Sequence, residues 1–195
     1  MPPTRPVSDI DLLVLLAVGR TTAECDLARA LPRVATHEAL AAMHAELLIE
    51  RDPTGSPIKL TPKGQAHLSN LLHKFNEACE PRPHSVLNQF NSLNTDIKRH
   101  IAGLRLPLES LSWNDVVLLR RHQVAGAALL AAISGWGDRY ENYRLRLNSA
   151  CNLVERGQLA FLADPRVASY HNSWFELHQD LLITTGTTRD ESAES

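Results

Sequence analysis

The second half of the chain carries the residues best suited to bind a small anion. Arg120, Arg144, His171 and His178 are basic, and each projects onto the face that its expected helix should bury. A buried cation must be paired or must meet an anion, because removing an unpaired charge from water is very costly. The apolar faces supply no obvious carboxylate for the two arginines. The pattern therefore predicts a site for a small carboxylate or phosphate ligand.

Polar and aromatic neighbours would complete this site. The expected ligand-binding residues are Asn94, Lys98, Trp113, Arg120, Arg144, Tyr170, His171, Trp174 and His178. A structural interpretation stays open beside this one. A core histidine usually bonds to backbone, arginine stems often reach the surface, and clustered aromatic rings more often fill a core than line a ligand site.

The same residues give no sign of catalysis. His171 and His178 are separated by about 10 Å along a helix, too far to chelate one metal as helical zinc sites do. Ser169, Tyr170 and His171 are adjacent, so on a helix their side chains point apart. The sequence also lacks a phosphate-binding glycine loop and the HExxH and GxSxG motifs. We therefore expect no enzymatic activity, no metal and no cofactor.

Four long helices are expected to position the candidate ligand site. The helical segments are Val86–Leu104, Trp113–Gly135, Arg139–Glu155 and Arg166–Thr184, separated by Pro and Gly breaks. The last segment projects one apolar half and one polar half, the latter with Asn172, Ser173, Glu176, Gln179 and Asp180. Four helices of this length predict an antiparallel bundle.

The first half has a different organisation. An almost wholly apolar helix is expected at Asp9–Val18, a short one at residues 23–31, and a third that Thr36 caps. Two short strands then flank a Pro/Gly/Ser turn, and Thr61-Pro62 starts another helix. Together these signals predict a mainly α protein whose N-terminal part is a winged helix-turn-helix with three helices and a two-stranded wing.

Composition separates the two halves. All ten aromatic residues lie from Phe75 onward, and a Pro-rich stretch follows closely. We expect a winged-helix domain at 1–79, a linker at 80–85, a helical bundle at 86–188 and a disordered tail at 189–195.

The three cysteines are far apart, and neither a targeting segment nor an apolar run of about 20 residues occurs. A cytoplasmic protein without membrane contact is expected.

Two family resemblances follow from these motifs. The segments Leu47-Leu48-Ile49-Glu50-Arg51 and Leu60-Thr61-Pro62-Lys63-Gly64, with the hairpin between them, resemble MarR-like winged-helix transcriptional regulators. The segment YHNSWFELHQDLL, with Leu93-Asn94 and Lys98, resembles an actinobacterial family that is also found attached to pyruvate phosphate dikinase-like proteins. Where that family has a glutamate, this chain has Gln179. The second resemblance implies a link to phosphoenolpyruvate or pyruvate metabolism.

A winged helix would place its third helix in the major groove of double-stranded DNA and its wing against the backbone. The expected DNA-binding residues are Arg33, Thr36, His37, Ala41, His44, Lys59 and Lys63. Residues 1–78 hold eight Lys or Arg and nine Asp or Glu, so this part has a net charge of −1. Phosphate contacts dominate affinity in most such complexes, and few are available here. We expect a homodimer, and dimerisation would double the number of these contacts.

Two functions stay open on the sequence alone. The leading hypothesis is a dimeric DNA-binding transcriptional regulator that responds to a small anionic metabolite bound in the helical domain. The alternative is a non-catalytic interaction module that docks on a dikinase-like or other metabolic enzyme and uses the winged helix for protein contacts.

Overall fold

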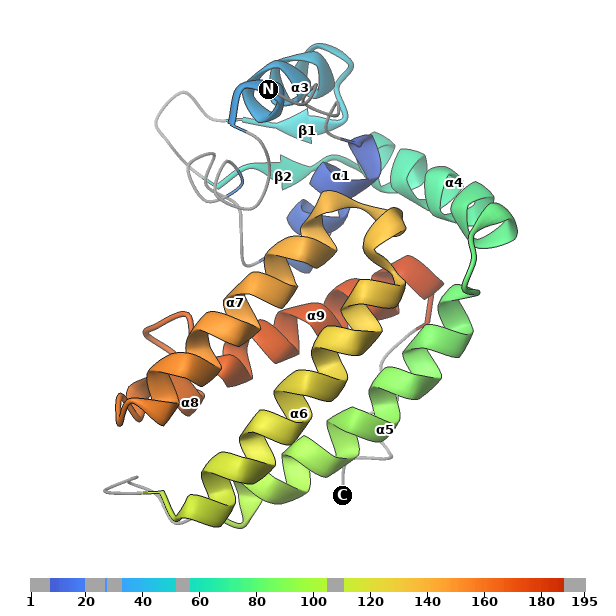
Figure 1. Cartoon of the computed structure of the whole chain (residues 1–195). Coiled ribbons are helices and arrows are strands. Elements are labelled where there is room, and N and C mark those ends of the chain that lie inside the picture. Colours follow the sequence, from blue (N-terminus) through green and yellow to red (C-terminus); the bar gives the residue numbers. More distant parts are fainter. Residues whose placement is uncertain (1–7, 20–26, 28–32, 52–56, 105–110, 188–195) are drawn as a thin grey trace, which may run out of the picture.

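The computed structural model describes residues 8–19, 27, 33–51, 57–104 and 111–187, and this part of the chain is mainly helical (Figure 1). The elements are α1 (Asp9–Val18), α3 (Arg33–Ala45), β1 (Ile49–Glu50), β2 (Lys59–Leu60), α4 (Pro62–Ala78), α5 (Pro83–Ala102), α6 (Trp113–Ala132), the 3-10 turn η1 (Ser134–Trp136), α7 (Asp138–Glu155), α8 (Ala160–Ala163) and α9 (Tyr170–Thr185). The second helix expected at 23–31, apart from the buried Leu27, and the tail at 189–195 lie outside the described residues.

The first helix follows the sequence prediction. Its residues Leu12 to Leu16 are all buried, as a run that is apolar on nearly all sides requires. Gly19 ends the helix with a φ of 75°, in the left-handed region that glycine adopts most readily. The helix packs against α4, β2, α7 and α9 and so belongs to both halves of the molecule.

The hairpin and the start of α4 also follow the prediction. The two strands are antiparallel, with Ile49 opposite Leu60 and Glu50 opposite Lys59. Thr61 caps α4, since its hydroxyl accepts a hydrogen bond from the Gly64 amide at 3.0 Å, and Pro62 is the first helical residue. Only glycine fits at position 64, because a Cβ atom there would lie 2.0 Å from the Leu48 carbonyl oxygen.

Helices α5, α6, α7 and α9 enclose an apolar core in the second half. In this arrangement α5 packs on α6, α6 on α7, α7 on α9 and α9 on α5, while α8 covers the ends of α7 and α9. A separate group of buried apolar side chains, drawn from residues 12–72, lies among α1, α3, the hairpin and α4. No helix in the described ranges has both the length and the apolar character needed to cross a membrane.

Several predicted boundaries are wrong by a few residues. The helix α5 begins at Pro83, inside the expected 80–85 linker, because proline is favoured at the first helical position. The helix α6 ends at Ala132 and a 3-10 turn follows. The last helix begins at Tyr170 rather than at Arg166, with Ser169 as its cap. Thr36 is not the cap of α3, which starts at Arg33.

The expectation that half of α9 is a polar outer face is also wrong. Asn172, Ser173, Glu176 and Asp180 are buried, because α1, α4, α7 and α8 cover the side of α9 that faces away from α5. A helix that touches five neighbours has little exposed surface left, so its polar side chains must find partners inside the protein.

A buried ionic network supplies partners at the junction of α1, α7 and α9. Arg139 is 0 % exposed and donates from Nε to Asp180 Oδ2 at 2.9 Å and from Nη1 to Asp11 Oδ1. Tyr140 donates its hydroxyl to Asp180 Oδ1 at 2.9 Å, and Arg139 Nη2 lies 3.2 Å from Thr184 Oγ1. This network joins the first helix of the chain to the last one.

Candidate functional site

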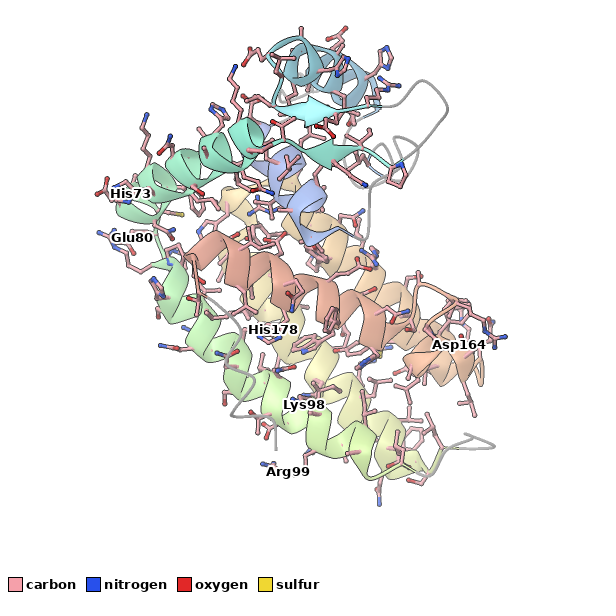
Figure 2. The ribbon with its side chains drawn as sticks, turned by 180° about the vertical axis from the view of Figure 1, so that it is seen from behind. His73, Glu80, Lys98, Arg99, Asp164 and His178 are labelled. Atoms are coloured by element: carbon pink, nitrogen blue, oxygen red, sulfur yellow. The ribbon has the colours of Figure 1, made fainter. Side chains whose placement is uncertain are left out.

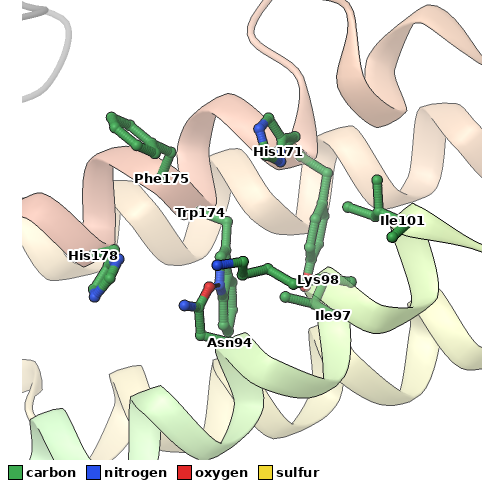
Figure 3. A pocket seen from close by; sticks show the side chains of 10 residues that line it. Asn94, Ile97, Lys98, Ile101, His171, Trp174, Phe175 and His178 are labelled. Carbon is green, nitrogen blue, oxygen red and sulfur yellow. Dashed lines mark hydrogen bonds between the residues drawn. The ribbon is translucent and has the colours of Figure 1, made fainter. Parts of the chain in front are cut away.

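A pocket of about 370 Å³ lies between α5 and α9. Its lining residues come in equal numbers from the two helices: Asn94, Ile97, Lys98, Ile101 and Ala102 from α5, and Tyr170, His171, Trp174, Phe175 and His178 from α9. Figure 3 shows these side chains meeting across the gap, and Figure 2 places Lys98 and His178 on the same side of the molecule. The volume is within the range of small-molecule sites.

Helical spacing explains why these residues meet. On α9, the lining positions recur at intervals of three or four residues, which places them on one face of the helix. Six of the nine expected ligand-binding residues line this pocket: Asn94, Lys98, Tyr170, His171, Trp174 and His178. The apolar lining residues Ile97, Ile101, Ala102 and Phe175 were not among the predicted residues, although their spacing on the same faces indicates them.

Trp174 forms a fixed wall of the pocket. Its indole Nε1 donates to Asn94 Oδ1 at 3.0 Å, and its ring stacks on Phe90 at 4.7 Å between centroids. On the far side, α6 approaches so closely that a Cβ at Gly126 would lie 2.9 Å from this ring. His178 also stacks on Phe90, at 5.2 Å. These contacts hold two pocket side chains in place before any ligand binds.

The pocket is basic and apolar. None of its lining residues is Asp or Glu, whereas Lys98, His171 and His178 bring basic nitrogens to an otherwise largely apolar wall. In Figure 3 the Lys98 side chain runs from α5 towards Asn94 and Trp174. Such a lining suits an anion with an apolar body, because the rings and isoleucines cover the body while the basic groups meet the charge.

The two arginines expected at this site lie elsewhere and have carboxylate partners. Arg120 donates from Nε to Glu155 Oε1 at 2.6 Å and from Nη2 to Asn152 Oδ1 at 2.7 Å. Arg144 donates from Nε to Glu141 Oε2 at 2.7 Å. The expectation that no carboxylate reaches them is therefore wrong, since long side chains turn sideways out of a helical projection. Trp113, at the start of α6, is 78 % exposed and forms no pocket wall.

Because of the Arg120–Glu155 ion pair, we expect the free energy of unfolding to depend on pH. The hydrogen bond from Arg120 lowers the pKa of Glu155 from its usual value. A carboxyl group whose pKa is lower in the folded state stabilises the protein above its unfolded pKa, and this contribution disappears as pH falls through the folded pKa. We expect Glu155→Gln to lower the free energy of unfolding by about 1 kcal/mol at neutral pH, a value reduced for partial exposure, and to have little effect near pH 3.

Urea unfolding at the two pH values measures this difference. Glu38→Gln, on the exposed side of α3, is the matched control and should change stability equally little at both. An equal effect of Glu155→Gln at both pH values would contradict the assignment.

Five of the seven expected DNA-binding residues lie on the surface of the first half. His37, Ala41 and His44 are exposed on α3, Lys59 is exposed on β2, and Lys63 is exposed at the start of α4. Lys63 donates to the Glu46 carbonyl oxygen at 2.6 Å, and His44 Nδ1 lies 3.3 Å from the Ile49 carbonyl oxygen. These two contacts connect α3 to the hairpin and to α4.

The remaining two expected DNA-binding residues are Thr36 and Arg33. Thr36 is 0 % exposed inside α3 and cannot reach a phosphate without a change in the helix packing. The side chain of Arg33 lies outside the described residues.

Sequence reasoning missed the network of Asp11, Arg139 and Asp180. The sequence signal for this network is Asp11, the acidic residue inside the apolar run of α1. A carboxylate in a buried helix requires a buried cation as its partner. Within the described part of the chain, no group of three His, Cys, Asp or Glu side chains is arranged to hold a metal ion.

Comparison of the chain with protein-family models, with curated proteins and with solved structures returned no match.

The pocket makes a direct prediction about ligands. We expect 3-phenylpropionate to stabilise the protein and the neutral, similarly shaped 3-phenylpropanol to do so much less, because only the acid meets the basic groups. At several times its Kd, a ligand stabilises by about 1 kcal/mol, which raises Tm by about 2–4 °C for a chain of this size. Thermal unfolding monitored by circular dichroism measures the shift.

Lys98→Gln should abolish most of the difference between the Tm shifts caused by the acid and by the alcohol. The substitution removes the positive charge and keeps much of the aliphatic part of the side chain. Lys74→Gln, on exposed α4, is the control and should preserve that difference. Equal shifts with both compounds would contradict an anion site.

Proposed function

We propose that the chain is a DNA-binding transcriptional regulator that responds to a small anionic metabolite. In this proposal α1, the segment before α3, α3 and the β1–β2 hairpin form a winged helix-turn-helix, and α4 leads to an antiparallel four-helix bundle of α5, α6, α7 and α9. The exposed face of α3, with the lysines beside the hairpin, contacts DNA. The pocket between α5 and α9 binds the metabolite, in the cytoplasm of a bacterial cell.

The position of α9 is the observation that carries the proposal. One side of α9 lines the pocket through Trp174 and His178, and other sides pack against α1 and α4. Near its end, Asn76 of α4 donates to the Thr184 carbonyl oxygen at 2.8 Å, and Ile183 packs against the apolar core of the first half. A shift of α9 upon ligand binding would therefore move the helices that support α3 and the hairpin.

The regulatory step follows from this shared helix. A ligand changes DNA affinity only if it binds the DNA-competent and DNA-incompetent arrangements with different affinity. The pocket walls come from two different helices, so closing α5 against α9 around a ligand gives such a difference. Coupling of this kind amounts to about 5- to 150-fold in affinity.

Salt-dependent DNA binding tests the proposal. We expect the full chain to bind mixed-sequence double-stranded DNA at about 50 mM salt and to weaken steadily towards about 200 mM, because bound phosphates release counterions. Fluorescence anisotropy with a labelled duplex measures the affinity at each salt concentration. An absence of binding at the lowest salt would contradict it.

One observation favours a second candidate function, docking on a metabolic enzyme such as a dikinase-like protein. Between positions 36 and 47 the exposed residues include Ala41, Ala42 and Ala45 and the 66 % exposed Leu47, with no lysine or arginine. Glu38 and Glu46 are also exposed there, so this surface is partly apolar and negatively charged, which suits a protein partner better than a phosphate backbone. Co-purification of one stoichiometric enzyme from the native host, with no DNA binding, would favour this second function.

A further inference from the structure

The outer face of α6, with Leu145 of α7 beside it, is unusually apolar. Of the five large apolar side chains that are exposed in the described residues, four lie on these two helices: Trp113 at 78 %, Val124 at 59 %, Leu145 at 53 % and Leu118 at 40 %. Exposed alanines continue this face at Ala128, Ala131 and Ala132. Figure 1 shows α6 and α7 side by side, joined by η1, on the side of the molecule nearest the viewer.

The solvent-exposed face of the neighbouring helix α5 is polar and serves as a comparison for the exposed face of α6. Its exposed positions from 88 to 99 are all polar or charged: Asn88, Gln89, Asn91, Ser92, Thr95, Asp96, Lys98 and Arg99. The outward positions of α6 carry one charge, Arg121, over the length of the helix. An exposed helix face that is mostly apolar is normally covered by a partner, yet among the described elements α6 has only α5, α7 and η1 as substantial neighbours.

The size of the side chains changes along this face. Its N-terminal half carries the bulky Trp113, Val117 and Arg121, and its C-terminal half carries alanines. Gly135, which has open space around it, lies in η1 just beyond the end of α6. Val124 lies midway between Trp113 and Gly135, eleven residues from each. An antiparallel copy of the same helix would set large residues against small ones along the whole face.

We propose that this face is the interface of a homodimer, in which the α6 helices of two copies pack antiparallel about a twofold axis beside Val124. The arrangement places Trp113 of each copy over Gly135 of the other, and Val117 over Ala131. It is isologous, so the same patch serves both copies and the assembly closes at two. This inference concerns a surface away from the pocket and from α3, and it does not rest on the proposed function.

The area and the charges of this face agree with a second copy of the chain as its binding partner. A helix of this length spans about 30 Å, and two neighbouring helices cover about 20 Å in width, so the layer offers about 600 Å² per copy. Stable interfaces bury about 800 Å² per partner, which the side chains that project from this layer would approach. The antiparallel arrangement also brings Arg121 of one copy towards the first turns of α7 in the other, where Glu141, the surface partner of Arg144, is exposed.

The oligomeric state of the full chain tests the inference. We expect light scattering after size exclusion to give twice the 21.6 kDa of one chain for the natural protein at micromolar concentration. Ala128→Glu, which places a carboxylate in the apolar contact, should raise the dimer Kd at least about 100-fold and give the mass of a monomer. Gln89→Glu makes the same change of charge on exposed α5 and should leave the dimer intact.

A second variant locates the axis. Val124→Cys should form a disulfide-linked dimer on mild oxidation, because residues at a twofold axis face themselves, whereas Ser92→Cys on α5 should not. A monomeric natural protein would overturn the inference. So would an Ala128→Glu protein that stays dimeric while its circular dichroism spectrum and Tm match those of the natural protein, because the interface would then lie elsewhere.

Discussion

Replacing Arg139 with methionine is expected to lower the free energy of unfolding by about 3–5 kcal/mol, a large part of the stability of a typical domain. Arg139 is fully buried, and two buried carboxylates, Asp11 and Asp180, share its guanidinium. Although burial opposes its ionisation, the charge of these carboxylates keeps the pKa of Arg139 well above its usual value. Without the cation, both acids would be left unpaired inside the protein, which costs far more than the lost contacts.

Chemical denaturation of the purified variant measures this loss, with Arg144→Met as the matched control. Arg144 also pairs with a carboxylate, but it lies at the surface, so its replacement should leave the denaturation midpoint unchanged. The double variant Arg139→Met/Asp180→Asn should be less destabilised than the sum of the single variants, because one of the stranded charges is removed as well. A loss below about 1 kcal/mol for Arg139→Met would contradict a buried network.

The double variant Lys59→Glu/Lys63→Glu is expected to reduce affinity for mixed-sequence DNA at least about 100-fold at low salt. Both lysines are exposed beside the hairpin, where a winged helix meets the phosphate backbone. Each phosphate contact that is lost also flattens the dependence of log K on log salt by about 0.9. Anisotropy titrations at several salt concentrations give both quantities.

Lys74→Glu/Arg99→Glu is the control for net charge. These residues are exposed on α4 and α5, so the variant changes the charge of the chain by the same amount at a distance from the hairpin. If this control weakens binding as much as the hairpin variant, DNA contact is not centred on the hairpin and that part of the proposal is wrong.

The sequence predicted the elements whose signals are local. The predictions of the hairpin and of α4 used a Pro/Gly/Ser turn, a threonine cap and a proline, all within 16 residues of one another. The structure has both strands and α4 where they were expected, and most of the turn lies outside the described residues. Pocket residues on α5 and α9 were also predictable, because polar groups recur at helical spacing on faces that must be buried.

The incorrect predictions involve contacts between residues that are distant in the chain. Arg120 meets Glu155 from another helix, and a projection of α6 alone contains no information about α7. The polar side of α9 is buried because α1 packs across it from the other end of the chain. Asp11 and Asp180 are 169 positions apart, so only the fold reveals that one arginine serves both.

Selection of DNA fragments from the native genome by the purified full chain, at low and at moderate salt, tests the central claim most directly. The proposed regulator should enrich an inverted repeat at moderate salt, because phosphate contacts alone weaken there while base contacts persist. Two half-sites about one helical turn apart would fit a twofold-symmetric dimer. Recovery of no sequence above background at either salt concentration would contradict the claim that this chain is a DNA-binding regulator.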